Sequence, residues 1–122
     1  MNRILVVEDE ADLAVTYDRL LRRNGYRVEM AASRVEGLKV MEAGSPALVI
    51  ADLRLPDGDA LDIIRAARAR EPQVPVIVVT AFSSPAARDA ALASGASAFL
   101  AKPFPASALL RLVHDELERS TP

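Results

Sequence analysis

Polar residues that could do chemistry follow four separate apolar runs of the chain. Glu8 and Asp9 follow ILVV, Asp52 follows LVIA, Thr80 follows VIVV, and Lys102 follows AFLA. Three carboxylates gathered in one place repel one another and raise one another's pKa unless a cation neutralises them. A hard divalent ion such as Mg²⁺, bound through oxygens with several waters retained, suits such a set. A carboxylate nucleophile, a metal ion, a hydroxyl and an ammonium are together what phosphoryl transfer requires.

The position of each residue favours a different role. Asp52 is the candidate nucleophile because its strand is expected in the middle of the sheet, with the other groups on either side. Glu8 and Asp9 suit metal ligation, directly or through water, and Thr80 could bond a phosphoryl oxygen. Lys102 adds a fixed positive charge but does not coordinate metal. Taken alone, Asp52 could equally bond turn amides or cap the following helix.

These residues need a sheet that brings them together. The apolar runs predict five strands, and helical periodicity and cap residues predict five helices between and after them. The strands are expected at 3–7, 26–31, 47–51, 75–79 and 97–101, and the third helix at 60–71. Strands that alternate with helices across short loops form a parallel sheet covered on both faces by right-handed crossovers. The carboxyl ends of such strands share one edge, and ligands bind in the crevice there.

Cap residues mark where several helices begin. Ser33 with Glu36 matches a capping box, Asp59 is the expected N-cap of the third helix, and Ser84 precedes Pro85 at the start of the fourth. The second strand alternates apolar and charged residues, which is typical of an edge strand with one wetter face.

Composition limits the class of protein. The chain has 122 residues, about half of them apolar, with a net charge of −2. This describes one globular domain and does not favour nucleic-acid or anionic-membrane partners. The chain has no cysteine, which excludes disulfide and thiol chemistry and is consistent with a cytoplasmic location. No apolar run approaches the ~20 residues of a membrane helix, and no signal peptide is present. Residues 120–122 are either a terminus or the start of a linker to an output domain.

The residues at the strand ends resemble those of the receiver domain of bacterial two-component response regulators. The likeness rests on Glu8-Asp9, Asp52, Thr80 and Lys102-Pro103 within ILVVEDE, ADLRLPDGD, VIVVTA and GASAFLAKPF, and it covers residues 3–119. It implies a flavodoxin-like three-layer α/β sandwich with strand order 2-1-3-4-5. The whole chain, residues 1–122, would then be one receiver domain.

The resemblance also implies how the site works. A histidine kinase, or a phosphotransfer protein, would phosphorylate Asp52, and the domain would catalyse only its own phosphorylation and dephosphorylation. The implied Mg²⁺ ligands are Glu8, Asp9, Asp52 and the backbone carbonyl of Arg54. The implied phosphoryl-binding groups are Thr80, the backbone amide of Ala81, and Lys102, with a cis peptide before Pro103. Arg54 and Phe82 stand where the family tunes loss of the phosphoryl group, in a direction that the sequence does not give.

In such receivers the threonine moves toward the phosphoryl group and an aromatic residue, here Phe99, swings inward. The surface of the fourth helix, fifth strand and fifth helix then changes, and it controls an output domain, a downstream protein or a second copy of the chain. The residues before Phe99 lack the acidic pair found in regulators that dimerise through salt bridges on this surface. Glu8 stands where many members have aspartate, so it is expected to reach the metal through water. Phe99 could also be a plain core residue.

Other functions fit less well. A flavodoxin or dinucleotide-binding protein needs a phosphate-binding loop after the first strand, where Glu8-Asp9-Glu10 would repel a phosphate. A phosphatase with an aspartyl nucleophile needs a general acid two residues further on, where this chain has Arg54. A receiver-like docking module that works without phosphorylation is the remaining alternative.

Overall fold

The computed structural model describes residues 2–70 and 72–120. Its centre is a five-stranded parallel sheet in the order β2-β1-β3-β6-β7. In chain order the elements are β1 (Arg3–Val7), α1 (Ala11–Arg23), β2 (Arg27–Ala31), α2 (Arg34–Ala43), β3 (Leu48–Asp52), β4 (Arg54–Leu55), β5 (Gly58–Asp59), α3 (Leu61–Arg68), β6 (Val76–Thr80), α4 (Pro85–Ala93), β7 (Ala98–Ala101) and α5 (Ala106–Ser120). Because β6 and β7 are the fourth and fifth predicted strands, the expected order 2-1-3-4-5 is confirmed, and β2 lies at an edge.

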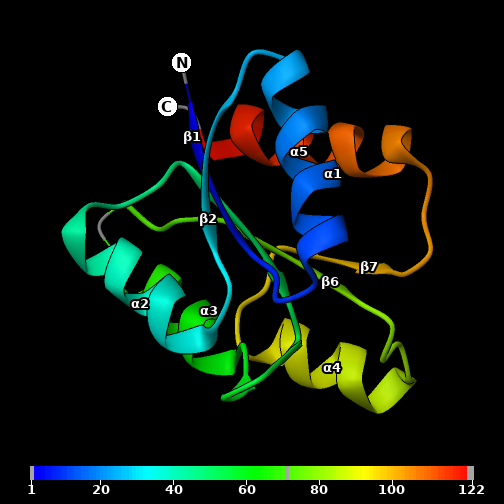
Figure 1. Cartoon of the computed structure of the whole chain (residues 1–122). Coiled ribbons are helices and arrows are strands. Elements are labelled where there is room, and N and C mark those ends of the chain that lie inside the picture. The colour runs from blue at the N-terminus through cyan, green and yellow to red at the C-terminus, as the bar shows by residue number, and fades with distance from the viewer. Residues whose placement is uncertain (1, 71, 121–122) are drawn as a thin grey trace.

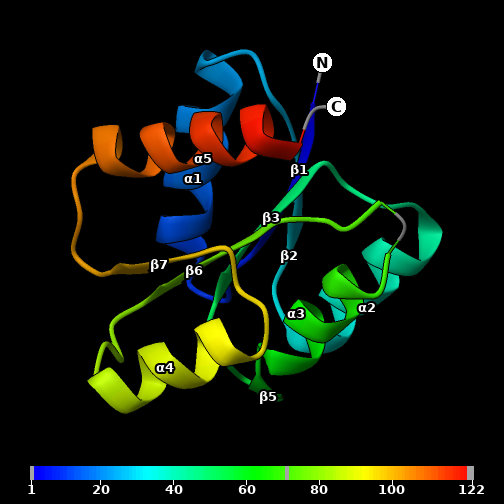
Figure 2. The same cartoon turned by 180° about the vertical axis from the view of Figure 1, so that it is seen from behind.

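Helices cover both faces of the sheet (Figures 1 and 2). Alternate residues along each strand point to opposite faces, so β1 contributes Leu5 and Val7 to one side and Ile4 and Val6 to the other. The first side packs against α2, α3 and α4, and the second against α1 and α5. All five residues of β3 are buried, which explains its uninterrupted apolar sequence up to Asp52.

Two helices begin as their cap residues predict. The Ser33 hydroxyl accepts a hydrogen bond from the backbone N–H of Glu36 at 3.2 Å, and that of Ser84 accepts one from Ala87 at 3.1 Å. Pro85 occupies the first turn of α4, where a missing N–H has no cost.

The third helix differs from the prediction at both ends. It begins at Leu61, with Ala60 at the cap position, although the Asp59 carboxylate still accepts a hydrogen bond from the Leu61 N–H at 3.0 Å. It ends at Arg68, earlier than expected, because the chain turns back and the Val74 N–H bonds the Ala67 carbonyl at 3.1 Å. The predicted end at residue 71 lies outside the described residues.

A small hairpin that the sequence did not predict follows β3. Its strands β4 and β5 pair antiparallel, Arg54 with Asp59 and Leu55 with Gly58. Two-residue strands are too short to show an alternating pattern, so periodicity gives no sign of this hairpin. Gly58 has φ +134°, a backbone conformation that favours glycine.

The helix α5 continues through Ser120, and residues 121 and 122 of the expected linker lie outside the described residues. Within the described part of the chain, no helix has the length and apolar character to cross a membrane.

Candidate functional site

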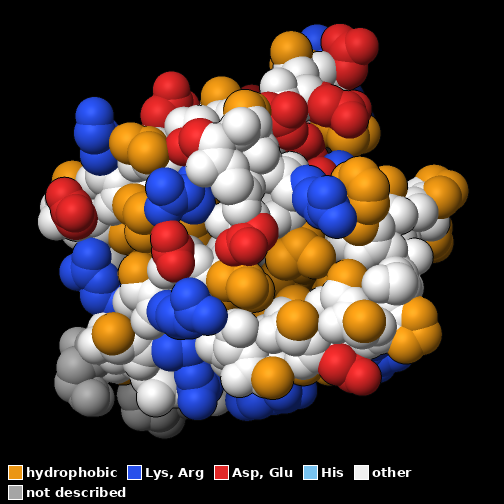
Figure 3. All heavy atoms as spheres, turned by 90° about the horizontal axis from the view of Figure 1, so that it is seen from below, with side chains coloured by type: hydrophobic (Ala, Val, Ile, Leu, Met, Phe, Trp, Pro, Cys, Tyr) orange, Lys and Arg blue, Asp and Glu red, His pale blue; other side chains and the backbone are white. Residues whose placement is uncertain are grey.

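The fold brings the chemically important residues to one edge of the sheet. Asp52 is the last residue of β3, which lies between β1 and β6, and Thr80 is the last residue of β6. Glu8 directly follows β1, and Lys102 directly follows β7. Viewed from this end (Figure 3), the molecule shows acidic and basic side chains set among hydrophobic ones.

Lys102 joins two of the predicted acids. Its ammonium nitrogen Nζ lies 2.7 Å from Oδ2 of Asp52 and 2.9 Å from Oε1 of Glu8. The acids are nearly buried, with Glu8 2% and Asp52 8% exposed. Buried carboxylates are costly unless they are paired and hydrogen-bonded, and the ammonium satisfies both at once.

The backbone holds the other oxygen of each carboxylate. Oδ1 of Asp52 accepts a hydrogen bond from the Arg54 N–H at 3.1 Å, and Oε2 of Glu8 accepts one from the Glu10 N–H at 3.2 Å. All four carboxylate oxygens therefore have a donor. Both acids are fixed in orientation, with one oxygen of each directed at the same cation.

Burial and pairing shift the proton affinities of this group. Burial raises the pKa of the Glu8 carboxyl above its usual value, although its hydrogen bond from Lys102 opposes the rise. Burial alone would lower the pKa of the Lys102 ammonium, but its bonds to Asp52 and Glu8 outweigh this and raise it. Lys102 therefore stays positively charged at neutral pH.

Thr80 lies beside this cluster and is fully buried. Its hydroxyl accepts a hydrogen bond from the Phe82 N–H at 3.1 Å, and its carbonyl accepts one from the Lys102 N–H at 2.9 Å. The second bond ties the end of β6 to the residue that carries the ammonium. Ala81 follows Thr80 and is an exposed residue.

The remaining predicted residues are placed as follows. Phe99 on β7 is partly buried and packs against the cluster under α2, α3 and α4. The peptide bond between Lys102 and Pro103 is cis. Asp9 is exposed. Among the described residues, no three acids or histidines stand close enough together to form a ready-made metal site.

A hard cation nevertheless suits this donor set. Glu8 and Asp52 present carboxylate oxygens to one positive charge, and the adjacent Asp9 is an exposed carboxylate. Such oxygens would hold an ion that keeps part of its water. Oxygen-only ligands of this kind match Mg²⁺ better than softer metals.

The family model of the response regulator receiver domain matches residues 4–114. The chain belongs to this family. Response regulator MprA of Mycobacterium sp. (strain KMS) is 37% identical over 120 residues, which cover 98% of this chain and 52% of that protein. MprA of Mycobacterium avium (strain 104) is 36% identical with similar coverage. This receiver domain thus spans about half the length of the curated relatives it matches.

Solved receiver domains share the architecture. The CheY-like receiver domain protein of Methanospirillum hungatei superposes with a TM-score of 0.93 at 30% identity, covering 98% of this chain and 96% of that one. A receiver domain of a sensor histidine kinase from Pseudomonas aeruginosa PAO1 superposes with a TM-score of 0.86 at 31% identity, covering 96% and 98%. That structure is described with a magnesium ion coordinated in its active site cleft. The identification of the chain as a response regulator receiver domain, and of its flavodoxin-like fold, is confirmed.

One feature of this receiver domain had no signal in the sequence. The guanidinium of Arg54 lies over the ring of Phe82, 4.3 Å from its centroid. Each residue stands two positions after a site residue, and each donates its backbone N–H to that residue's side chain, Asp52 or Thr80. The cation–π pair therefore links the loops that follow β3 and β6, directly beside the phosphoacceptor candidate.

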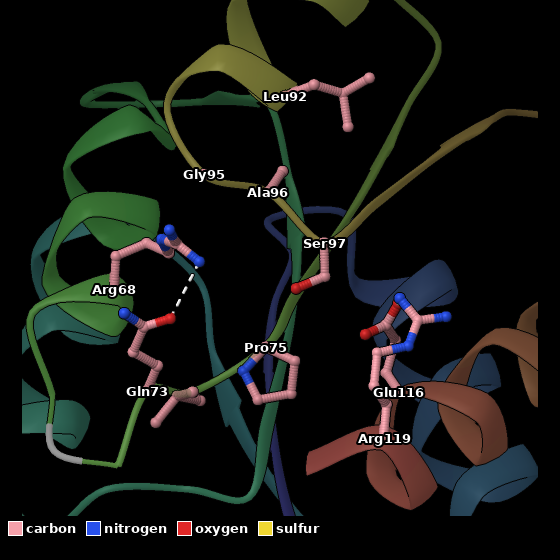
Figure 4. Close-up of a pocket in the computed structure, with 10 residues that line it drawn as sticks. Arg68, Gln73, Pro75, Leu92, Gly95, Ala96, Ser97, Glu116 and Arg119 are labelled. Carbon is pink, nitrogen blue, oxygen red and sulfur yellow. Dashed lines mark hydrogen bonds and ion pairs between the residues drawn. The ribbon is translucent and has the colours of Figure 1, made fainter.

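A hollow of about 390 Å³ lies at the opposite end of the sheet from the strand-end site, beside the residues that precede β6 and β7. Figure 4 shows Arg68 and Gln73 on one side of it and Glu116 and Arg119 on the other. Arg68 donates a hydrogen bond to Gln73 at 2.9 Å, and Arg119 pairs with Glu116 at 3.5 Å. The polar side chains at this end bond each other, in contrast to the strand-end site, where carboxylates converge on a cation.

Proposed function

We propose that this receiver domain is a phosphorylation-activated switch of a two-component system. A sensor histidine kinase or a phosphotransfer protein supplies the phosphoryl group, and Asp52 accepts it. The observation that carries the proposal is the shared ion pair, in which Lys102 meets Asp52 at 2.7 Å and Glu8 at 2.9 Å. A buried nucleophile held beside a fixed cation is the arrangement that electrostatic catalysis of phosphoryl transfer needs.

Mg²⁺ is the cofactor of this proposal. Glu8, Asp9, Asp52 and the backbone carbonyl of Arg54 would hold it, and the ion would offset the charge that builds up on the phosphoryl oxygens. The side chains have separate tasks. A carboxylate oxygen of Asp52 would attack phosphorus as the bond from phosphorus to the donor's histidine nitrogen breaks, which leaves the donor's imidazole and an acyl phosphate on Asp52. Lys102, Thr80 and the Ala81 amide would receive the phosphoryl oxygens.

The output of the switch would be a change in surface. Thr80 leaves its bond to the Phe82 N–H to meet the phosphoryl group, and Phe99 repacks into the space behind it. The surface formed by α4, β7 and α5 then presents a different shape to an output domain, a downstream protein or a second copy of the chain. Moving a two-state equilibrium from mostly off to mostly on requires about 5 kcal/mol of preference for the active state. The charge-assisted contacts of a phosphoryl dianion with Mg²⁺, Lys102 and Thr80 are strong enough to provide this free energy.

The chain spans about half the length of the curated relatives it matches. We propose that it works in the cytoplasm, where a histidine kinase and its response regulator meet. The weakly acidic net charge of −2 argues against direct binding of nucleic acid or an anionic membrane by this domain.

The test is incubation with Mg²⁺ and acetyl phosphate, followed by intact-mass measurement. We expect the wild type to gain one phosphoryl group and Asp52→Ala to gain none. Asp59→Ala is the matched control, because Asp59 is an exposed carboxylate in the same loop. An unlabelled wild type, or equal labelling of Asp52→Ala, would contradict the proposal and favour a docking module that works without phosphorylation.

A further inference from the structure

The side chain of Asp57 caps a helix from a distant part of the chain. Its Oδ1 accepts a hydrogen bond from the Arg34 N–H at 2.8 Å, and its Oδ2 accepts one from the Val35 N–H at 3.0 Å. Asp57 lies at the tip of the β4–β5 hairpin, 22 residues after Val35. The loop that follows the phosphoacceptor strand is therefore attached to the start of α2.

The helix α2 needs this carboxylate. The first four N–H groups of a helix have no partner within it. The Ser33 hydroxyl accepts the N–H of Glu36 at 3.2 Å, and the Ser33 carbonyl accepts that of Gly37 at 3.1 Å in the first regular bond of the helix. Asp57 accepts the N–H groups of Arg34 and Val35, and its negative charge is favoured at a helix N-terminus. The bonds to the Arg34 and Val35 N–H groups lower the pKa of the Asp57 carboxyl, so it is ionised at neutral pH.

Arg34 holds the same hairpin tip from the other side. Its Nε donates to the Asp57 carbonyl at 3.4 Å, and its Nη1 pairs with Asp62 of α3 at 2.7 Å. A Cβ at Gly58 would lie only 3.4 Å from Arg34 Nε, so the side chain passes close to the hairpin backbone. The tip is thus held by both the backbone and the side chain of Arg34.

The other end of the hairpin meets the site. The Arg54 N–H donates to Oδ1 of Asp52 at 3.1 Å, and Arg54 pairs with Asp59 across the hairpin. The Ala60 N–H closes the base of the hairpin by bonding the Leu53 carbonyl at 2.9 Å. An attachment at the tip therefore limits where the backbone of Arg54 can lie.

We propose that Asp57 is a positioning residue for the phosphorylation site. By holding the hairpin tip on α2, it fixes the turn from Asp52 to Arg54, whose backbone carbonyl would be one of the Mg²⁺ ligands. This inference rests on the proposed function, because it concerns the same Mg²⁺ and the same phosphoacceptor.

The experiment compares Asp57→Ala with Ser33→Ala. Both variants remove cap bonds from the N-terminus of α2, but only the first also removes bonds that hold the hairpin tip on this helix. Mg²⁺ affinity is measured by isothermal titration calorimetry, melting temperature by circular dichroism, and the Mg²⁺ dependence of acetyl-phosphate labelling by intact mass. We expect Asp57→Ala to weaken Mg²⁺ binding by about tenfold, the scale typical of residues that orient metal ligands. Ser33→Ala is expected to melt at a lower temperature with Mg²⁺ affinity within about twofold of wild type.

Asp57→Asn is a second, milder variant. It keeps an acceptor oxygen for one of the two backbone N–H groups, so we expect its Mg²⁺ affinity to lie between those of the wild type and Asp57→Ala. The inference is overturned if Asp57→Ala binds Mg²⁺ as tightly as the wild type, or if Ser33→Ala loses affinity to the same extent. A wild type that neither binds Mg²⁺ nor becomes labelled would instead refute the proposed function, and this inference with it.

Discussion

The ammonium of Lys102 lies 2.7 Å from Oδ2 of Asp52, although the two residues are 50 positions apart in the chain. The same nitrogen bonds Glu8, so one cation balances both buried acids. In our proposal phosphorylation converts the Asp52 carboxylate into an acyl phosphate, and Lys102 transfers its pairing to the phosphoryl oxygens. The ion pair is then a contact that the modification must rearrange, which makes Lys102 the residue to alter first.

Lys102→Met is expected to lower the free energy of unfolding at neutral pH by about 2 kcal/mol. The loss arises because Glu8 and Asp52 are left buried without a counter-charge. It is smaller than the usual loss on removing one partner of a buried ion pair, because the Lys102 side chain is 14% exposed. Millimolar Mg²⁺ should raise the melting temperature of this variant more than that of the wild type, since the ion replaces the missing cation. The control is Lys39→Met, which removes the chain's other lysine from an exposed position. If Mg²⁺ raised the melting temperature of all three proteins equally, the idea that Lys102 neutralises both buried acids would be contradicted.

Phe82→Ala is expected to shorten the lifetime of the phosphorylated state. The Arg54–Phe82 pair lies beside Asp52, and we expect it to limit the approach of water to the acyl phosphate. A cation–π contact at an exposed position contributes about 0.5 to 1 kcal/mol, so its loss should speed dephosphorylation by about two- to fivefold. The decay is followed by intact mass after removal of acetyl phosphate.

Arg54→Ala tests the same contact from its other partner. If the two side chains act together, the double variant should lose its phosphoryl group no faster than either single variant. Additive effects, or slower decay in Phe82→Ala, would show that the stacked pair does not shield the site.

Gly95→Ala is expected to destabilise the domain more than Gly25→Ala. Both glycines have positive φ, +112° and +89°, so alanine is strained at either position, by about 1 to 2 kcal/mol. At Gly95 the new Cβ would also lie 2.6 Å from Cγ of Arg68, whereas at Gly25 it meets nothing within 4 Å. We expect about 1 kcal/mol of additional loss at Gly95, measured by urea unfolding. Adding Arg68→Ala should remove that excess, and equal losses at the two glycines would contradict the steric explanation.

Tyr17 should make the domain sensitive to alkaline pH. Burial raises the pKa of its phenol to about 12, so between about pH 10 and 12 the folded state keeps a proton that the unfolded state has lost. The free energy of unfolding therefore falls as pH rises through this window. The fall is about 1.4 kcal/mol for each unit by which the pKa in the folded state exceeds that in the unfolded state. Tyr17→Phe removes this contribution but keeps the ring that stacks on Phe104, 6.4 Å between centroids.

Urea unfolding of both proteins at several alkaline pH values checks this prediction. The stability of the wild type should decline more steeply than that of Tyr17→Phe. Lys102 contributes a decline of the same sign in both proteins, because its raised pKa also keeps a proton in the folded state. Parallel curves would contradict the assignment to Tyr17.

The sequence by itself determined the fold class and the residues at the strand ends. The apolar runs before Glu8, Asp52, Thr80 and Lys102 are local signals, and parallel pairing places the ends of such strands at one edge. The caps at Ser33 and Ser84 were equally local, because each bonds an amide three residues away. Such features depend on near neighbours along the chain, which a sequence displays directly.

Only the tertiary structure decided which groups at the site contact one another. Lys102 meets both Glu8 and Asp52, while Asp9, adjacent in sequence to Glu8, is exposed. The stacking of Arg54 on Phe82 joins loops that no periodicity relates. The carboxylate of Asp57 caps a helix that begins 23 residues earlier, a role that its place in a turn does not indicate. Each of these contacts depends on the packing of separate crossovers on the sheet, and a side chain gives no sequence signal of a partner so far along the chain.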